Sequence, residues 1–473
     1  MANQTYNPKS VSSILEFGMM LLDKTLREVH SEAQTLAGKG GLGMSVEKYH
    51  YGYEPNSESD PDFAEAGLEL KCTPLKKLKD QSMAAKERLV LNIINYLEEA
   101  NKHFESSSFY KKNKLLLLMF YLYESGVDPV DMKFKLIRKW KFSNVDRRII
   151  EQDWNVIHSK IMNGQAHTLT EGDTFYLAAC MKGSKSNAEM RKQPNSEILA
   201  QQRAYSLKTG YINKIILDSY LDHKQEHKLQ ISKKREDYLK RKYYSDKIVT
   251  STRSFKSETE TFEQLIERRI KPFYNKTVGQ IEKKRNIPIN IKAKDLSYNV
   301  CRVILGIKTR KICEFEKAGI TLKSIVLESE RDKIIESMSF PYIRFVEMVH
   351  QNWEESDWHE QLSSKFLFAV FRKSPDRDKK KMKLVKVFFW NMPYEDLLKA
   401  ESFWEETKQK VKEGNYQGLT TNKSNKICHI RPHGTKNQRV ATPQGEMIRP
   451  KSFWLNNDYI LDVVMKHIND GSN

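Results

Sequence analysis

One short stretch, Asp62–Lys71, constrains most strongly what this chain can fold into; with the residues up to the next proline it reads D-F-A-E-A-G-L-E-L-K-C-T-P. Leu68 and Leu70 alternate with Glu69 and Lys71, which is the period-two pattern of a half-buried β-strand. We therefore expect a strand over 62–71 whose two leucines enter a core. Glu69 and Lys71 then point together out of the other face.

The chemistry of this stretch depends on one more acidic residue. Asp62 lies beside the turn signal Asp60-Pro61 and can fold back toward the start of the strand. Two carboxylates and one ammonium group would then share a small volume. Carboxylate oxygens suit a hard cation such as Mg²⁺, and a neighbouring lysine can orient a water, so the set fits metal-assisted hydrolysis of a phosphodiester. The simpler interpretation of so short a pattern is an exposed strand with an ordinary Glu/Lys pair.

Further motifs accompany this stretch in a fixed order along the first half. They are G-K-G-G-L-G-M-S-V-E ending at Glu47, S-S-F-Y-K-K containing Lys112, E-Q-D-W containing Asp153-Trp154, Y-L-A-A-C-M-K ending at Lys182, and Leu207-Lys208. This series resembles the MutH-like nucleases, which comprise a mismatch-repair nicking endonuclease and type II restriction endonucleases that cut at GATC. Because of the chain length and the second half, the likeness is greatest to the longer, two-domain GATC restriction enzymes.

The resemblance implies an active centre in the first half. Asp62 and Glu69 would hold Mg²⁺, and Lys71 would position the attacking water. Lys112 would lie near the scissile phosphate, while Glu47 would support the metal from a helix, with Lys39 nearby. Taken alone, Glu47 is a solvated helix residue, and Lys112 is a solvated strand flank whose neighbour Lys111 fits equally well.

Two segments are candidates for contact with DNA. Lys182–Lys192, which includes Lys185, is a polar loop of small and cationic residues, and such loops can approach phosphates or guanine edges. The resemblance places Lys182 on a recognition loop. The second segment carries Tyr205 and Lys208 in Y-S-L-K-T-G-Y-I. The alternative for both segments is an ordinary charged surface.

Length and charge limit the number of domains and the kind of partner that this chain can have. The chain has 473 residues, which favours two domains, and a formal charge of +19. A surplus of that size favours an acidic polymer as partner, with double-stranded DNA as the leading candidate, although charge alone decides little.

The cellular setting is inferred from what the sequence lacks. The five cysteines are scattered without a C-x-x-C pair, which favours a reducing interior. The N-terminus lacks a signal peptide, and the longest apolar run, Leu115–Tyr123, is too short to span a bilayer. We therefore expect a cytoplasmic, prokaryotic protein with no membrane partner. The resemblance adds a companion DNA methyltransferase in the host that is not a stable subunit.

The remaining pattern predicts an α/β chain. We expect a helix over 11–36, a buried strand over Leu115–Tyr123, an edge strand over Met132–Trp140 and a helix over Ile149–Ile161. Residues 222–256 are highly charged and mostly basic, which is typical of a charged helix or a linker. We predict a nuclease domain over 1–221, a basic helical linker over 222–259 and a second domain over 260–473.

The second half contains a degraded repeat of the first. Asp62–Leu75 and Glu314–Leu327 share six of fourteen residues. Four further pairs follow in the same order: S-S-F-Y-K-K at Ser107 with S-S-K-F-L-F at Ser363, Trp154 and Gly164 with Trp404 and Gly414, M-K-G at Lys182 with R-P-H-G at His433, and Y-S-L-K-T-G-Y-I with F-W-L-N-N-D-Y-I. Five matches in one order indicate duplication.

The substitutions between the copies separate binding from cutting. Glu69 corresponds to Thr321 and Asp62 to Glu314, and the region N-V-C-R-V-I-L-G that corresponds to Glu47 offers no acid. A metal site without these carboxylates binds its cation poorly. The second copy should therefore keep the fold and lose cleavage, while cations such as Arg431, with His433 beside it, remain for DNA.

These observations predict two α/β domains of restriction-endonuclease type, each a mixed sheet flanked by helices. The predicted function is magnesium-dependent cleavage of double-stranded DNA at GATC by the first domain, with the second domain binding another site as an allosteric effector. A strand-nicking repair endonuclease and a non-enzymatic DNA-binding protein are the alternatives.

Overall fold

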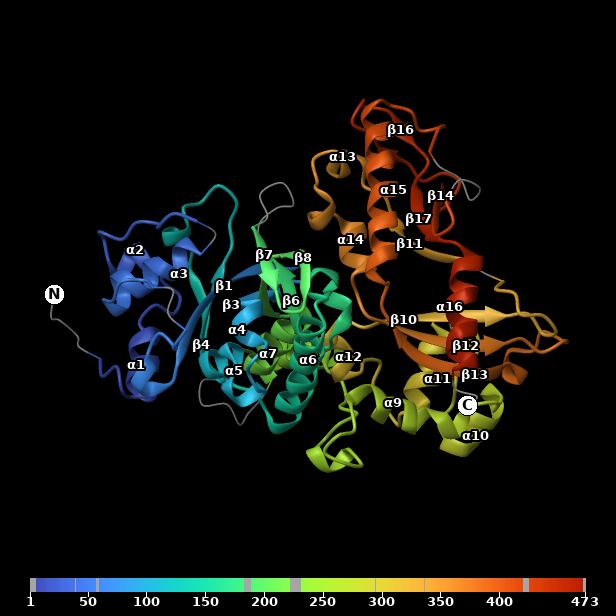
Figure 1. The fold of residues 1–473 in the computed structure, drawn as a ribbon, viewed down its shortest axis with the longest axis horizontal. Helices are drawn as coiled ribbons and strands as arrows, with labels where there is room; N and C mark the ends of the chain where they lie inside the picture. The colour runs from blue at the N-terminus through green and yellow to red at the C-terminus, as the bar shows by residue number, and fades with distance from the viewer. Residues whose placement is uncertain are drawn as a thin grey trace.

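The computed structural model describes residues 6–38, 40–56, 59–182, 189–221, 231–293, 295–335, 337–419 and 425–470. The first half of the chain forms the left part of the molecule, and the second half forms the right part (Figure 1). Among the described residues, no helix is both long and apolar enough to cross a membrane.

The first half is built on two sheets and the helices around them. Its strands are β1 (Glu69–Lys77), β2 (Met83–Ala85), β3 (Leu89–Ile93), β4 (Leu115–Leu122), β5 (Phe134–Lys141), β6 (Leu177–Met181), β7 (Met190–Gln193), β8 (Ser196–Gln201) and β9 (Arg203–Leu207). Its helices are α1 (Val11–Met19), α2 (Leu26–Val29), α3 (Gly41–Ser45), α4 (Tyr96–Glu99), α5 (Ser108–Asn113), α6 (Asn144–Met162) and α7 (Thr209–Leu221); α8 (Lys233–Tyr243) follows toward the second half.

The larger sheet of the first half has the order β2-β1-β4-β5. β1 and β4 run parallel, with Glu69 opposite Leu116, and the continuous apolar run of β4 is buried between its two neighbours. β5 is antiparallel to β4 and forms the edge, as its alternating pattern predicts. A second sheet has the order β3-β9-β6, and β7 pairs with β8 as a hairpin.

The second half has its own set of elements. Its strands are β10 (Thr321–Leu327), β11 (Met338–Tyr342), β12 (Phe366–Arg372), β13 (Lys383–Trp390), β14 (Cys428–Pro432), β15 (Val440–Ala441), β16 (Met447–Ile448) and β17 (Lys451–Leu455). Its helices are α9 (Phe262–Ile270), α10 (Val278–Arg285), α11 (Leu296–Ile304), α12 (Cys313–Ala318), α13 (Phe345–Met348), α14 (Asp357–Leu362), α15 (Tyr394–Lys412) and α16 (Asn457–Asn469).

The two halves have the same topology, so the predicted duplication is confirmed. The parallel pair β10 and β12 with antiparallel β13 repeats β1, β4 and β5. The sheet β11-β17-β14 repeats β3-β9-β6, and the hairpin β15–β16 repeats β7–β8. The long helices α6 and α15 both have 19 residues, and the last helices α7 and α16 both have 13.

The helix N-caps correct one sequence pairing between the copies. Ser107 is the N-cap of α5, and the matching N-cap of α14 is Ser356 rather than Ser363. Each cap hydroxyl donates to the carbonyl three residues earlier, at 2.6 Å and 2.7 Å. The repeated S-S dipeptide misled the alignment by seven residues. The counterpart of Lys112 is therefore Gln361.

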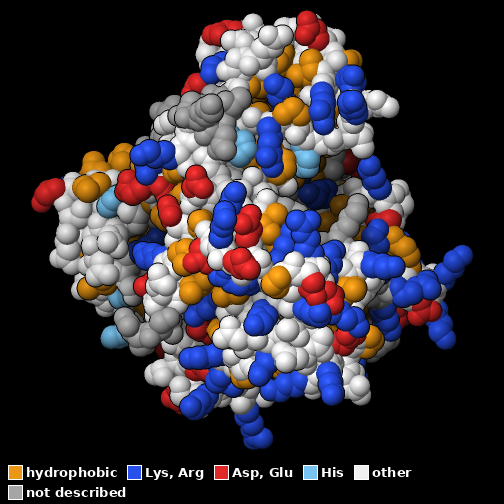
Figure 2. All heavy atoms as spheres, turned by 90° about the vertical axis from the view of Figure 1, so that its right-hand side faces the viewer, with side chains coloured by type: hydrophobic (Ala, Val, Ile, Leu, Met, Phe, Trp, Pro, Cys, Tyr) orange, Lys and Arg blue, Asp and Glu red, His pale blue; other side chains and the backbone are white. Residues whose placement is uncertain are grey.

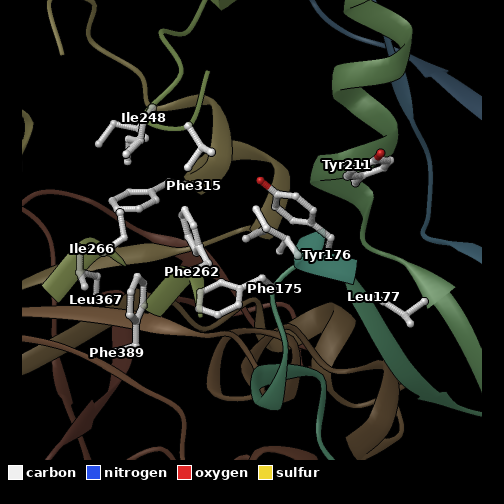
Figure 3. Packing of buried hydrophobic residues seen from close by; sticks show 14 of the residues in the cluster. Phe175, Tyr176, Leu177, Tyr211, Ile248, Phe262, Ile266, Phe315, Leu367 and Phe389 are labelled. Atoms are coloured by element: carbon white, nitrogen blue, oxygen red, sulfur yellow. The ribbon is translucent and has the colours of Figure 1, made fainter. Parts of the chain in front are cut away.

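The copies are joined through a continuous hydrophobic core (Figure 3). Phe175, just before β6, meets Phe262 and Phe389 of the second half edge to face, with ring centroids 5.1 Å and 5.2 Å apart. Edge-to-face aromatic pairs contribute beyond their buried area. The face of the second copy around β13 and α9 is thus attached firmly to the segment that leads into β6.

Polar contacts fix the same junction. Lys317 of α12 donates to both carboxylate oxygens of Asp146 on α6, at 2.7 Å and 2.8 Å, and Tyr211 donates to that carboxylate at 3.1 Å. A Cβ at Gly210 would lie 2.1 Å from the Glu316 carbonyl, so only glycine allows α7 to approach α12 this closely. A buried ion pair with further hydrogen bonds is costly to break, so the junction favours one arrangement of the two halves.

Two predicted elements differ in extent from the observed ones. The helix expected over 11–36 ends at Met19, because the chain turns at Asp23, whose φ is 60°, and its N–H donates to the Phe134 carbonyl. The strand expected over 62–71 begins only at Glu69, because a 3₁₀ turn over Ala64–Ala66 precedes it.

Candidate active site

A tight turn brings Asp62 back onto the start of β1. Phe63 and Leu68 pair with each other through two backbone hydrogen bonds of 3.0 Å and 3.3 Å. Gly67 closes the turn at φ 62°, a conformation that favours glycine. The sequence spacing D-x6-E therefore becomes direct contact between the two acidic residues.

Asp62 and Glu69 are fixed by reciprocal hydrogen bonds to backbone. The backbone N–H of Asp62 donates to Oε2 of Glu69 at 3.0 Å, and the N–H of Leu70 donates to Oδ2 of Asp62 at 2.8 Å. One oxygen of each carboxylate is thus held by the backbone.

Two lysines complete the cluster from different elements. Nζ of Lys71, on β1, lies 2.5 Å from Oε1 of Glu69. Nζ of Lys112 lies 3.8 Å from the same oxygen and comes from the last turn of α5, not from a strand flank as the sequence suggested. The structure therefore brings Asp62, Glu69, Lys71 and Lys112 together, and it selects Lys112 over Lys111 for this contact.

Glu69 is buried rather than placed on an open face. Its side chain is only 1 % exposed. Burial raises the pKa of Glu69 to about 7; the Lys71 ammonium opposes this rise, and the Asp62 carboxylate adds to it. The prediction of an outward-pointing Glu/Lys pair was right about the pairing and wrong about the exposure of Glu69.

Glu47 approaches the cluster from a separate helical segment. It lies on a single π-helical turn, Val46–Tyr51, which ends at Gly52 with φ 77°. Burial raises the pKa of Glu47 to about 7, with a further contribution from the Asp62 carboxylate. Short π-helical turns recur at functional sites because they redirect a side chain. Lys39, expected nearby, lies outside the described residues.

The donor set fits a hard divalent cation. The carboxylates of Glu47, Asp62 and Glu69 lie near one another, Glu69 buried and the other two half-buried, and oxygen ligands of this kind suit Mg²⁺. In the described part of the chain, no three acidic, histidine or cysteine side chains are already gathered tightly enough to form a metal cluster. The Lys71 ammonium instead lies against Glu69.

The raised pKa of Glu69 predicts a pH-dependent stability in metal-free buffer. In the folded state Glu69 keeps its proton up to about pH 7, whereas in the unfolded chain it ionises near its ordinary value of 4.5. The folded state then binds more protons between these values, so the contribution of Glu69 to the unfolding free energy falls as pH rises.

We therefore expect Glu69→Gln, which cannot ionise, to gain stability relative to the parent between pH 5 and pH 8, by about 1–3 kcal/mol. Urea unfolding in the presence of a chelator at both pH values measures this difference. Glu65→Gln, in the same turn and 63 % exposed, is the matched control and should show no such trend. A constant difference between parent and Glu69→Gln would show that Glu69 titrates alike in both states.

The residues predicted to contact DNA in the first half differ in how accessible they are in the structure. Lys182 is half-buried at the end of β6, where its N–H donates to the Gln202 carbonyl at 2.9 Å. Lys185 lies outside the described residues. Tyr205 is fully buried and donates to Glu99, while Nζ of Lys208 donates to the Thr174 carbonyl at 2.6 Å.

The prediction that Tyr205 and Lys208 face DNA therefore does not fit this fold. β9 is the central strand of its sheet, and the Tyr205 ring packs 5.3 Å from that of Phe109. Burial lowers the pKa of Lys208 to about 7, against the nearby Asp153 carboxylate. Asp153 itself accepts three backbone N–H groups at 2.6–2.9 Å, so this region organises the core.

Of the two contact residues predicted in the second copy, one is exposed and the other, His433, is half-buried. Arg431 is exposed on β14, and its guanidinium lies 3.6 Å from the centre of the Trp454 ring. Nδ1 of His433 lies 2.7 Å from the Ser452 hydroxyl. The register of β14 with β17 makes His433 the counterpart of Lys182, as the sequence pairing indicated.

The former active-site positions of the second copy have other contacts. The carboxylate of Glu314, counterpart of Asp62, accepts the backbone N–H groups of Ile248 and Val249 at 2.9 Å and 2.8 Å. Nζ of Lys323, counterpart of Lys71, donates to the Ser339 carbonyl at 3.0 Å. Glu69 is replaced by Thr321, and Glu314 and Lys323 make hydrogen bonds to the backbone. The second copy therefore offers no free carboxylate at these three positions.

One residue near the cluster was missed from the sequence. Tyr53 follows the π-helical turn, and its N–H donates to the Glu47 carbonyl at 3.2 Å. A lone tyrosine beyond a helix gives no sequence signal of its own. The only available signal was the repeat itself, since V-E-K-Y-H-Y-G-Y aligns without a gap to V-C-R-V-I-L-G-I and places Tyr53 opposite Ile307.

Comparison with known proteins agrees with the duplicated architecture. The family described as DNA mismatch repair enzyme MutH matches the chain in two segments, residues 51–153 and 305–401, one in each copy. The type II restriction enzyme Sau3AI of Staphylococcus aureus is 32 % identical over an alignment 496 positions long, which covers 92 % of this chain and 94 % of that protein. With two MutH-like copies and an intact acidic cluster in the first, this chain belongs to the MutH-like type II restriction endonucleases, which are site-specific deoxyribonucleases.

Proposed function

We propose that this protein is a Mg²⁺-dependent endonuclease that cuts both strands of DNA at GATC with its first copy, while its second copy binds another site as an effector without cutting. The observation that carries the cleavage half is the cluster of Asp62, Glu69, Lys71 and Lys112 in the first copy. The target GATC rests on the resemblance of the motif series to the GATC-cutting members of the family. A DNA methyltransferase in the host would protect its own sites.

The side chains of the cluster have separable roles. Asp62 and Glu69 would hold Mg²⁺, with Glu47 in support, and the cation would polarise the phosphate and stabilise developing charge. Lys71 would orient the attacking water, because its ammonium already lies against Glu69. Lys112 would approach the scissile phosphate from the end of α5.

The effector role is supported by what the second copy retains and what it has lost. Its counterparts of the carboxylates are Thr321, Cys301 and the backbone-bound Glu314, so its own cutting is not expected. Lys and Arg side chains are nevertheless spread across the side of the molecule that Figure 2 shows. Lys379, Lys380 and Lys381 of the second copy are also exposed. Such a surface suits phosphate contacts.

One assay tests the cleavage proposal. Supercoiled plasmid with GATC sites is incubated with the protein in Mg²⁺ or in a chelator, and the ends are mapped. Linear products with ends at GATC, seen only with Mg²⁺, are the expected result. Nicked circles alone would favour a strand-nicking repair enzyme, and cleavage at another sequence would overturn the GATC assignment.

Lys182→Ala is expected to weaken binding to the cognate site more than binding to random DNA. If Lys182 contacts a base from the end of β6, the cognate loss is roughly 1–3 kcal/mol. Fluorescence anisotropy in Ca²⁺ with both DNAs measures it. Lys466→Ala, which removes one exposed charge from α16, is the control and should affect both DNAs alike. Equal losses for Lys182→Ala would make it a phosphate contact only.

A further inference from the structure

The hydroxyl of Tyr53 is an unexplained polar group beside the acidic cluster. It is buried and has no hydrogen-bond partner among the described residues. A buried hydroxyl left unpaired costs about 1–3 kcal/mol, so such groups in folded proteins usually have a reason. The hydroxyl thus points to a partner that reaches it in another state of the site.

The surroundings of Tyr53 tie it to the two chain segments that carry Glu47 and Asp62. Its backbone is tied to Glu47 by the 3.2 Å hydrogen bond that ends the π-helical turn. Its ring packs edge to face against Phe63, the neighbour of Asp62, with centroids 5.6 Å apart. Burial raises the pKa of Tyr53 above its ordinary range, and the next contributions come from the carboxylates of Asp62, Glu47 and Glu69.

The internal repeat gives an independent argument. Between the copies, Glu47 becomes Cys301, Glu69 becomes Thr321, and Tyr53 becomes Ile307, which is 3 % exposed. The glycines that fix the register, Gly52 and Gly306, have nearly the same φ of 77° and 75°. The hydroxyl has therefore disappeared together with the acidic groups, in a copy that keeps an apolar side chain at the same place.

We infer that Tyr53 is a positioning residue of the active centre, whose hydroxyl donates a hydrogen bond to the Asp62 carboxylate and orients it toward the divalent cation. This assignment rests on the proposed Mg²⁺-dependent cleavage. Asp62 then has one oxygen held by the Leu70 N–H and the other aligned by Tyr53.

Tyr53→Phe removes the hydroxyl and keeps the ring against Phe63, so the fold should be retained. We expect the cleavage rate to fall roughly 10–100-fold, as for loss of a hydrogen bond to a charged group. The affinity for Mn²⁺ should fall several-fold. It is measured on DNA-free protein from the electron paramagnetic resonance signal of the Mn²⁺ that stays unbound. The melting temperature in chelator should stay the same or rise, because an unpaired hydroxyl is removed.

Tyr6→Phe is the matched control. Tyr6 belongs to the same aromatic cluster, 6.0 Å from Phe63, but its hydroxyl already donates to the Tyr51 carbonyl at 2.9 Å. That variant should lose stability and keep both Mn²⁺ affinity and cleavage. Parental Mn²⁺ affinity and cleavage in Tyr53→Phe, or a loss of stability like that of Tyr6→Phe, would overturn the positioning role. Because Mn²⁺ binding is read without cleavage, failure here is distinguishable from a parent protein that does not cut.

Discussion

Replacing Glu69 by alanine is expected to reduce the rate of DNA cleavage roughly 100–1000-fold. This is the loss typical when one group that stabilises transition-state charge is removed. Glu69 is the centre of the cluster: one oxygen receives the Asp62 N–H, and the other lies against Lys71 and within 3.8 Å of Lys112. Under the proposed mechanism its loss would remove a metal ligand, and it would also loosen both Asp62 and Lys71. Plasmid cleavage in Mg²⁺, followed over time, measures the rate.

Comparing two substitutions separates charge from geometry. Glu69→Gln keeps an oxygen for the Asp62 N–H but offers no charge to a cation, so it should be as inactive as Glu69→Ala. Both variants should still bind cognate DNA in Ca²⁺, and Glu65→Ala in the adjacent turn should cut normally. Cleavage by Glu69→Ala within tenfold of the parent, which is only about 1.4 kcal/mol of barrier, would refute the ligand role.

The parts of the fold that were predictable are those set by local pattern. The apolar run in β4, the alternation of apolar and charged residues in β5 and the helical spacing of apolar residues in α6 each predict the element from its own residues. No contact with a distant segment is needed to recognise these elements. The ends of elements were less predictable, since they depend on distant partners. The first helix ends at Met19 because the following turn pairs with Phe134, more than a hundred residues away.

The same division holds for the site. Asp62, Glu69 and Lys71 are close in sequence, so their meeting followed from one turn and one strand. The burial of Glu69 and the approach of Lys112 from α5 depend on how separate elements pack. Tyr205 shows the limit most clearly: alternation assigns it to one face of a strand, but only the packing of Phe109 of α5 against its ring, in a strand buried throughout, makes that face internal.

The second large effect is expected on substrates with two sites. If the second copy binds GATC without cutting, DNA bound there can favour the active state of the first copy only by its differential affinity for that state. Two-site plasmid should then be cut faster than one-site plasmid at equal site concentration, by roughly 5–150-fold for a typical coupling. A short cognate duplex added in trans should accelerate cutting of the one-site plasmid.

The junction between the copies provides a physical route for this coupling. Phe175 packs on Phe262 and Phe389 of the second copy (Figure 3), and two residues later begins β6, which ends at Lys182. The Asp153 carboxylate accepts hydrogen bonds from three backbone N–H groups of this same segment, residues 175–177. If the second copy shifts on binding DNA, this packing would pass the shift to the strand that carries the predicted recognition residue.

The double substitution Arg431→Ala with His433→Ala tests whether β14 is the effector surface. Arg431 is exposed and stacked on Trp454, so its loss removes a cation from the surface without opening the core. Stimulation by the trans duplex should disappear while one-site cutting persists, and Lys466→Ala should retain both. If the second copy only supports the first, one-site and two-site plasmids are cut at the same rate, the trans duplex merely competes, and the effector role falls.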